Sequence, residues 1–177
     1  MRWFLSLVMS FAFAASALAQ TYINTVGSDD RTAIAGFDVV AFHTDKKAVA
    51  GSPAHAHEHL GAKWLFSSAE HLNAFRAEPD KYIPAWGGQC AAALAEAGAL
   101  STKKLNGDFG FHDGKLYLFA YGNRSRNGAK DWFMYGRVGK PMLVRDGDKS
   151  WPELRRQLLD GSLRQPTSAD YRKSPYE

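Results

Sequence analysis

The stretch from Gly51 to Cys90 constrains the fold of this chain more than any other, because it carries a nearly unbroken series of local structure signals. Residues 55–59 read HAHEH, and residues 63–67 read KWLFS after a turn at 60–62. Two β-prone runs separated by a short glycine-containing turn predict an antiparallel hairpin. We therefore expect the first part of this stretch to form a two-stranded sheet.

A helix is predicted directly after this hairpin. Ser67 and Glu70 fit the S-x-x-E capping pattern of a helix start, and Pro79 ends the helical pattern. An alanine-rich helix is expected next, from about residue 89 to 97, ended by Gly98. The stretch thus predicts two helices packed beside the hairpin.

The rest of the chain adds a second hairpin and a last helix. Residues 106–121 form the hairpin, with an Asp-Gly turn at 113–114. Residues 37–42 and 142–144 are β-prone and predict short strands or extended segments. Residues 150–159 predict an amphipathic helix with Pro152 in its first turn. The predicted fold class is α+β: a small antiparallel sheet built from hairpins with two or three packed helices.

The first nineteen residues have the pattern of a secretory signal peptide. Arg2 gives a positive start, residues 3–14 are apolar, and Ala17-Leu18-Ala19 is a small-x-small cleavage site. We therefore divide the chain into a signal peptide (1–19), an extended lead-in (20–35), a single α+β domain with a divergent C-terminal part (36–160) and a loosely ordered tail (161–177).

Charge and composition narrow the classes of partner. No later stretch approaches membrane-spanning length, so we expect no membrane insertion after cleavage and a periplasmic or secreted protein. The formal net charge is +4 with both signs interspersed, which does not indicate a nucleic-acid binder. Cys90 is the only cysteine, so the domain has no internal disulfide.

The order and spacing of motifs resemble the exported branch of the YHS domain family. The similarity covers about residues 36–121, through GFDVVAF, then GAKWLFSS, then the helix ending FRAEPDKY, then GGQC and DGKLYLFAY. The matching positions are Gly36, Phe37, Asp38, Val40, Ala41, Phe42, Gly61, Trp64, Phe66, Ser68, Phe75, Pro79, Tyr82, Gly87, Gly88 and Cys90. The resemblance implies a small α+β domain and the handling of transition metals.

The strongest candidate for chemistry is the histidine array of residues 55–59. On a strand, alternate residues share a face, so His55, His57 and His59 point the same way. Imidazole binds copper and zinc, and a further ligand would come from His43 or Cys90. The predicted cofactor is thus a transition-metal ion, copper or zinc, although a solvated polar strand without a ligand explains the pattern equally well.

Three functions follow from these observations. The first is a non-enzymatic exported domain that binds or handles a transition metal through His55, His57, His59, His43 and Cys90. The second is a metal-free interaction module that binds another protein of the cell envelope. The third is a thiol-dependent enzyme, which would pair Cys90 with a histidine base. No pattern in the sequence fixes such a pair, so we expect no enzyme.

Overall fold

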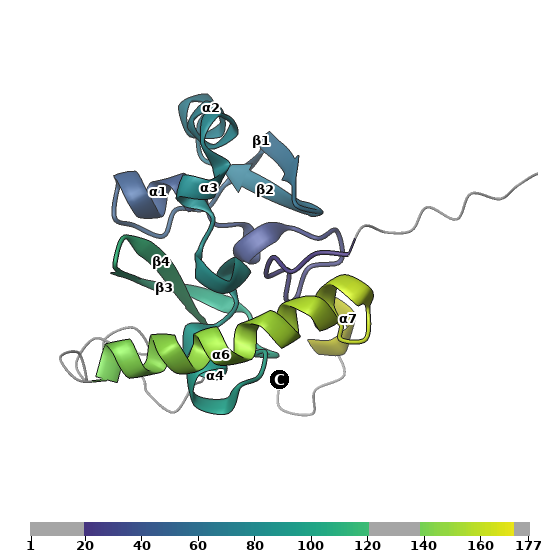
Figure 1. Ribbon diagram of the computed structural model, residues 1–177. Coiled ribbons are helices and arrows are strands. Elements are labelled where there is room, and N and C mark those ends of the chain that lie inside the picture. The colour runs from purple at the N-terminus through teal and green to yellow at the C-terminus, as the bar shows by residue number, and fades with distance from the viewer. Residues whose placement is uncertain (1–19, 121–138, 172–177) are drawn as a thin grey trace, which may run out of the picture.

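The computed structural model describes residues 20–120 and 139–171, so the predicted signal peptide lies outside the described residues (Figure 1). The elements follow one another as η1 (Ala33–Gly36), α1 (Val39–Thr44), β1 (Ser52–His59), β2 (Ala62–Phe66), α2 (Ala69–Ala77), α3 (Pro79–Tyr82), η2 (Ala85–Gly88), α4 (Ala91–Ala97), β3 (Leu105–His112), β4 (Lys115–Ala120), α6 (Gly139–Asp160) and α7 (Ser168–Tyr171). None of the helices in this part of the chain combines the length and apolar character needed to cross a membrane.

Both predicted hairpins are present and confirm the α+β class. Strand β1 pairs antiparallel with β2, and β3 pairs antiparallel with β4, giving two separate two-stranded sheets rather than one. Each hairpin closes through a two-residue turn with positive φ at both positions: 52° and 73° at Leu60-Gly61, and 48° and 76° at Asp113-Gly114. Such turns match the right-handed twist of the strands.

The expected strand at residues 37–42 is wrong, because the chain enters helix α1 at Val39. Phe37 and Asp38 are extended, and Phe37 bridges to Ala50. Asp38 is the N-cap, and its Oδ1 accepts hydrogen bonds from the backbone N–H groups of Val40 and Ala41 at 2.9 and 3.3 Å. This cap satisfies amides that a helix start leaves unpaired, and it outweighs the β preference of the two valines.

Helix α2 begins one residue later than predicted. Ser68, not Ser67, is the N-cap, and its hydroxyl accepts a hydrogen bond from the backbone N–H of His71 at 3.2 Å. Ser67 instead donates to Asp38. The predicted alanine-rich helix is confirmed as α4, which ends at Gly98 with a left-handed φ of 58°.

The long helix α6 replaces the predicted strand at 142–144 and begins well before the predicted start at residue 150. Leu143, Val144, Trp151 and Leu154 pack against the core at helical spacing, so the apolar run belongs to a helix face. Pro152 lies inside this helix rather than in its first turn. Gly147 allows close packing, because a Cβ there would lie 2.4 Å from the Trp86 ring.

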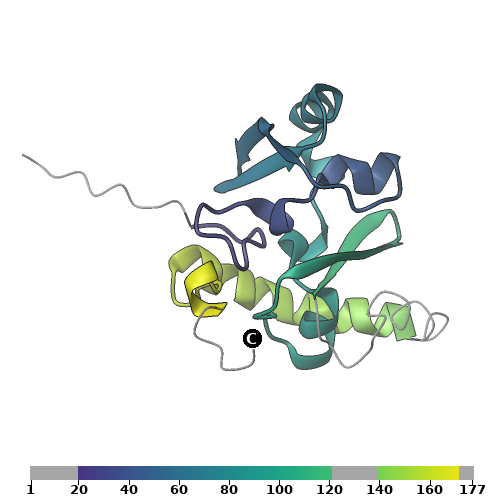
Figure 2. The ribbon, with the colours of Figure 1, turned by 180° about the vertical axis from the view of Figure 1, so that it is seen from behind.

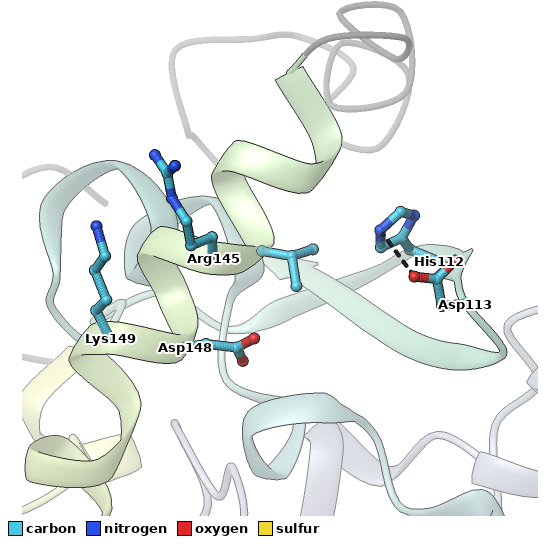
Figure 3. A pocket seen from close by; sticks show the side chains of 6 residues that line it. His112, Asp113, Arg145, Asp148 and Lys149 are labelled. Atoms are coloured by element: carbon cyan, nitrogen blue, oxygen red, sulfur yellow. Dashed lines mark ion pairs between the residues drawn. The ribbon is translucent and has the colours of Figure 1, made fainter.

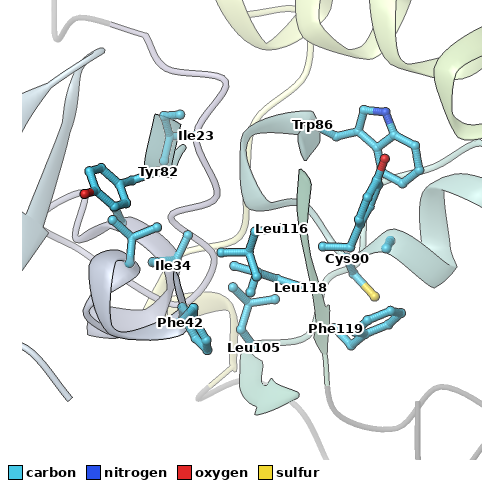
Figure 4. Close-up of a cluster of buried hydrophobic side chains, with 14 of the residues drawn as sticks. Ile23, Ile34, Phe42, Tyr82, Trp86, Cys90, Leu105, Leu116, Leu118 and Phe119 are labelled. Atoms are coloured by element: carbon cyan, nitrogen blue, oxygen red, sulfur yellow. The ribbon is translucent and has the colours of Figure 1, made fainter. Parts of the chain in front are cut away.

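The core lies around strand β4, which is buried on both faces (Figure 4). Leu116 and Leu118 point toward Ile34 and Phe42 on one side, and Phe119 points toward Cys90 on the other. Helix α6 runs along this half of the molecule beside α4, while α2 lies at the opposite end over the first hairpin (Figures 1 and 2). The first hairpin is thus packed against α2, and the second lies on the side of α4 and α6.

The lead-in and the C-terminal segment are joined. The Gln165 side chain accepts from the Thr25 backbone N–H at 2.9 Å and donates to the Ile23 carbonyl at 2.7 Å. The Gly27 N–H donates to the Pro166 carbonyl at 2.8 Å. The described part of the predicted loose tail, up to Tyr171, therefore makes specific contacts with the start of the domain.

Candidate metal centre

Strand β1 turns its histidines toward helix α2. His57 and His59 both contact the ring of Phe75 on α2, and His55 lies within electrostatic range of Glu70 in the first turn of that helix. All three histidines are partly exposed. The predicted shared face is therefore present for His57 and His59, and it borders the helix instead of open solvent, whereas His55 lies where the register with β2 is irregular.

The rings of His57 and His59 form a parallel pair. Their centroids are 6.3 Å apart, with planes inclined by only 15°. Each ring meets Phe75 edge to face, at centroid distances of 6.2 and 5.6 Å. Phe75 is fully buried and also contacts Trp64 and Phe66 of β2. One buried aromatic ring thus supports both imidazoles from below.

His57 is held toward its neutral form. Partial burial lowers its pKa below the usual 6.5, and the nearby charges of Arg76 and His59 lower it further, against the opposing effect of Glu58. Metal binding requires a neutral imidazole, since the lone pair of the ring nitrogen makes the bond. At neutral pH this environment favours the ligand form of His57.

The other two predicted ligands lie elsewhere. His43 is on α1 with its ring between Tyr82 and Phe111, at centroid distances of 5.3 and 5.0 Å. Its Nε2 is buried and has no hydrogen-bond partner, and burial, with Lys46 and Lys81 nearby, lowers its pKa. This histidine packs as a ring in an aromatic cluster.

Cys90 is only 1 % exposed and is the N-cap residue of α4. Its backbone bridges to Leu118, in the core of the second hairpin. Within residues 20–120 and 139–171, no three or more His, Cys, Asp or Glu side chains are grouped so as to hold a metal ion. The structure therefore brings together the histidines of β1 and joins neither His43 nor Cys90 to them in such a group.

A polar cluster that the sequence analysis did not identify lies at the start of α2. Asp38 is fully buried, and its Oδ2 accepts from the Ser67 N–H at 2.8 Å, the Ser67 hydroxyl at 2.6 Å and His71 Nδ1 at 2.7 Å. Nδ1 is the donor because an ionised carboxylate only accepts. His71 Nε2 lies 3.5 Å from the Thr44 hydroxyl on α1.

These contacts keep Asp38 ionised. Burial alone would raise its pKa, but the hydrogen bonds from Ser67 and His71 outweigh burial and lower it below 3.8. A weak sequence signal for this cluster exists, because Ser67 and His71 are four residues apart at a helix start. Their partner lies about thirty residues earlier in the chain, where only the folded structure reveals it.

A separate pocket of about 450 Å³ lies between the tip of the second hairpin and α6 (Figure 3). It is lined by His112, Asp113, Val144, Arg145, Asp148 and Lys149. His112 pairs with Asp113 at 3.5 Å, and Arg145 and Lys149 both pair with Asp146. Asp148 accepts a hydrogen bond from Trp86 Nε1 at 2.9 Å, so charges of both signs line this pocket.

No family model, no curated protein and no solved structure matches this chain.

Proposed function

We propose that this protein is a non-enzymatic exported domain that binds a transition-metal ion, copper or zinc, through His57 and His59. The observation that carries the proposal is the pair of partly exposed imidazoles, 6.3 Å apart, on one buried aromatic support. The lowered pKa of His57 supports it, because the neutral ring is the ligand form. The resemblance to exported YHS domains and the signal-peptide pattern support the same proposal.

Binding requires a small rearrangement of the pair. Metal–nitrogen bonds to histidine are about 2.0–2.1 Å long, so the two coordinating nitrogens must approach within about 4 Å. Parallel rings direct their lone pairs alongside one another rather than toward one point. To bind one ion, one or both rings would have to rotate against Phe75. Such an open site suits the transfer of a metal between proteins better than permanent storage.

The ligand set favours zinc or copper(II) over copper(I). Two imidazoles and water are borderline-to-hard ligands, whereas copper(I) prefers thiolate and thioether sulfur. The thiol of Cys90 is buried against the second hairpin and belongs to the core. We therefore revise the ligand set to His57 and His59, with His55 of the same strand as a candidate third ligand.

Metal titration of the mature protein tests this proposal. Copper(II) and zinc should bind in a 1:1 ratio, and His57→Ala or His59→Ala should each weaken binding at least tenfold. His112→Ala is the matched control, since His112 is a partly exposed histidine of the other hairpin. His43→Ala and Cys90→Ala should also leave the affinity unchanged. Equal affinity in wild-type and His57→Ala/His59→Ala protein would refute the site and favour the metal-free interaction module.

Thiol labelling separates this proposal from a thiol-dependent enzyme. A nucleophilic cysteine must be accessible as a thiolate, and Cys90 is only 1 % exposed. We expect Cys90 to react with an aromatic disulfide reagent at least a hundredfold more slowly in the native protein than in urea. Rapid labelling of native protein at neutral pH would favour the enzyme instead.

A further inference from the structure

Helix α2 is tied to helix α1 by a contact that neither helix needs for its own cap. Asp38 caps α1 with Oδ1 alone, through Val40 and Ala41. Ser68 caps α2 independently. Oδ2 of Asp38 is therefore left to bind Ser67 and His71 across the two elements. This second oxygen fixes where α2 lies relative to α1.

The tied helix in turn supports the imidazole pair. His71 and Phe75 are four residues apart on α2, which places them one turn apart on neighbouring positions of the helix. Phe75 contacts the rings of both His57 and His59. A shift of α2 would therefore move the surface against which both imidazoles pack. His71 Nε2 also lies 3.5 Å from the Thr44 hydroxyl of α1, so the same ring borders both helices.

We infer that Asp38 and His71 are positioning residues for the metal pair, acting through α2 and Phe75 on the orientation of His57 and His59. This inference rests on the proposed function. The carboxylate that makes the contact is fully buried, and it accepts five hydrogen bonds from four residues. Because the carboxylate itself is fully buried, the loss of the His71 donor leaves one of its oxygens with fewer hydrogen bonds, which costs stability.

The contact limits how far the two imidazoles can move apart before a metal binds. Phe75 limits the rotation of both rings, and the Asp38–His71 contact limits the movement of Phe75. A looser α2 would spread the two imidazoles over more orientations, so fewer molecules would hold the rings side by side, one small rotation away from a shared ion. The metal affinity then falls even when the protein stays folded, because the paired arrangement that precedes binding is less populated.

The test compares three variants of the mature protein. His71→Leu removes the donor to Asp38, whereas His71→Asn keeps an N–H near the position of Nδ1. Ser68→Ala weakens the same helix at its cap without touching Asp38. The readouts are the aromatic carbon and proton shifts of His57 and His59 in metal-free protein, the zinc affinity, and the melting temperature.

We expect His71→Leu to shift the ring signals of His57 and His59 and to weaken zinc binding about tenfold. His71→Asn should restore most of both. Ser68→Ala should lower the melting temperature while leaving the ring signals and the affinity near wild type. If His71→Leu lowers only the melting temperature, the contact is merely structural and the inference is overturned.

The role of Asp38 and His71 can be tested even if His71→Leu does not fold or the wild-type protein binds no metal. If His71→Leu does not fold, Ser67→Ala removes one donor to Asp38 and should shift the same ring signals by a smaller amount; unchanged signals would overturn the inference. If wild-type protein binds no metal, the proposed function fails by itself. The positioning of the two rings by Asp38 and His71 would still be supported by shifted signals in the metal-free variants and refuted by unshifted ones.

Discussion

The two hairpins of this protein share a local design and differ in their surroundings. Both are antiparallel, both have an irregular register away from the turn, and both turn through two residues with positive φ. Strand β4 of the second hairpin is buried along nearly its whole length between Ile34 and Phe42 on one side and Cys90 on the other. Strand β1 of the first hairpin has no fully buried residue.

This difference decides what the side chains of each hairpin can do. In the second hairpin, every position from Leu116 to Ala120 contributes to the core. In the first hairpin, α2 covers the histidine face through Phe75 but leaves His57 and His59 accessible at its edge. Similar local signals thus give a structural element in one place and a candidate ligand-binding element in the other.

The largest effect is expected from removing the support of the first hairpin. Phe75→Ala deletes a fully buried ring that contacts both strands, and should lower the free energy of unfolding by about 3–5 kcal/mol. Urea denaturation measures this loss. Leu72→Ala, on the same helix but only partly buried, is the control and should cost clearly less. Equal costs would show that the first hairpin does not depend on Phe75.

The second hairpin should be sensitive to crowding from α6. Gly147→Ala places a methyl group 2.4 Å from the Trp86 ring, which contacts Tyr117 of β4 at 5.1 Å. We expect a loss of about 1–3 kcal/mol, although alanine is normally the better helix former. In a Trp86→Leu background the same change should cost less, because the smaller side chain makes room. A stabilising effect in the wild-type background would contradict the close packing.

A substitution in the turn of the first hairpin should stabilise the protein. Leu60 has a left-handed φ of 52°, where leucine is strained, whereas the second hairpin has Asp113 at the equivalent position. Leu60→Asn should raise the free energy of unfolding by about 1 kcal/mol, since asparagine suits this turn. Asp113→Asn is the control and should change it little. Thermal melting measures both, and a destabilised Leu60→Asn protein would show that the leucine side chain makes a needed contact.

The smallest expected effect is a dependence of stability on pH. The pKa values of His43 and His57 are lowered in the folded protein, chiefly by burial, so the unfolded chain binds protons more readily. Their contribution to stability is complete above about pH 6.5 and is lost as the pH falls below that value. The melting temperature should fall between pH 7.5 and 5.5.

His43→Phe tests the source of that decrease. Phenylalanine keeps the ring contacts with Tyr82 and Phe111 and removes the unpartnered Nε2. The variant should show a flatter pH dependence and unchanged zinc affinity. An unchanged slope would assign the pH dependence to His57 or to other groups. A weakened zinc affinity would return His43 to the ligand set.

Signals that act over a few residues allowed much of the fold to be predicted. The Asp113-Gly114 turn, the helix end at Gly98 and the first hairpin were all predictable. Their backbone conformations and hydrogen bonds depend on residues close by in the sequence. The errors came where a local preference was overruled. Val39 and Val40 favour a strand, but the Asp38 cap places them in a helix, and Leu143 and Val144 pack on the core from helix α6.

The candidate site was predictable only in part. Alternation along a strand placed His57 and His59 on one face, and the structure agrees. The alternation could not show that α2 covers this face, that His43 joins an aromatic cluster, or that Asp38 contacts His71. These depend on which apolar surfaces bury one another, and many pairings of such surfaces are compatible with the same local pattern.

The sequence by itself determined the hairpins, their turns, the C-terminal ends of α2 and α4 and the alternation of His57 and His59, since each depends on bonds and sterics within a few residues. Only the tertiary structure decided that β4 is buried in the core while β1 keeps its imidazoles accessible. The reason is that burial is a property of the whole chain. Strand β4 is covered on both faces, so its side chains serve the core. Strand β1 is covered only in part by one helix, so its side chains keep exposed atoms.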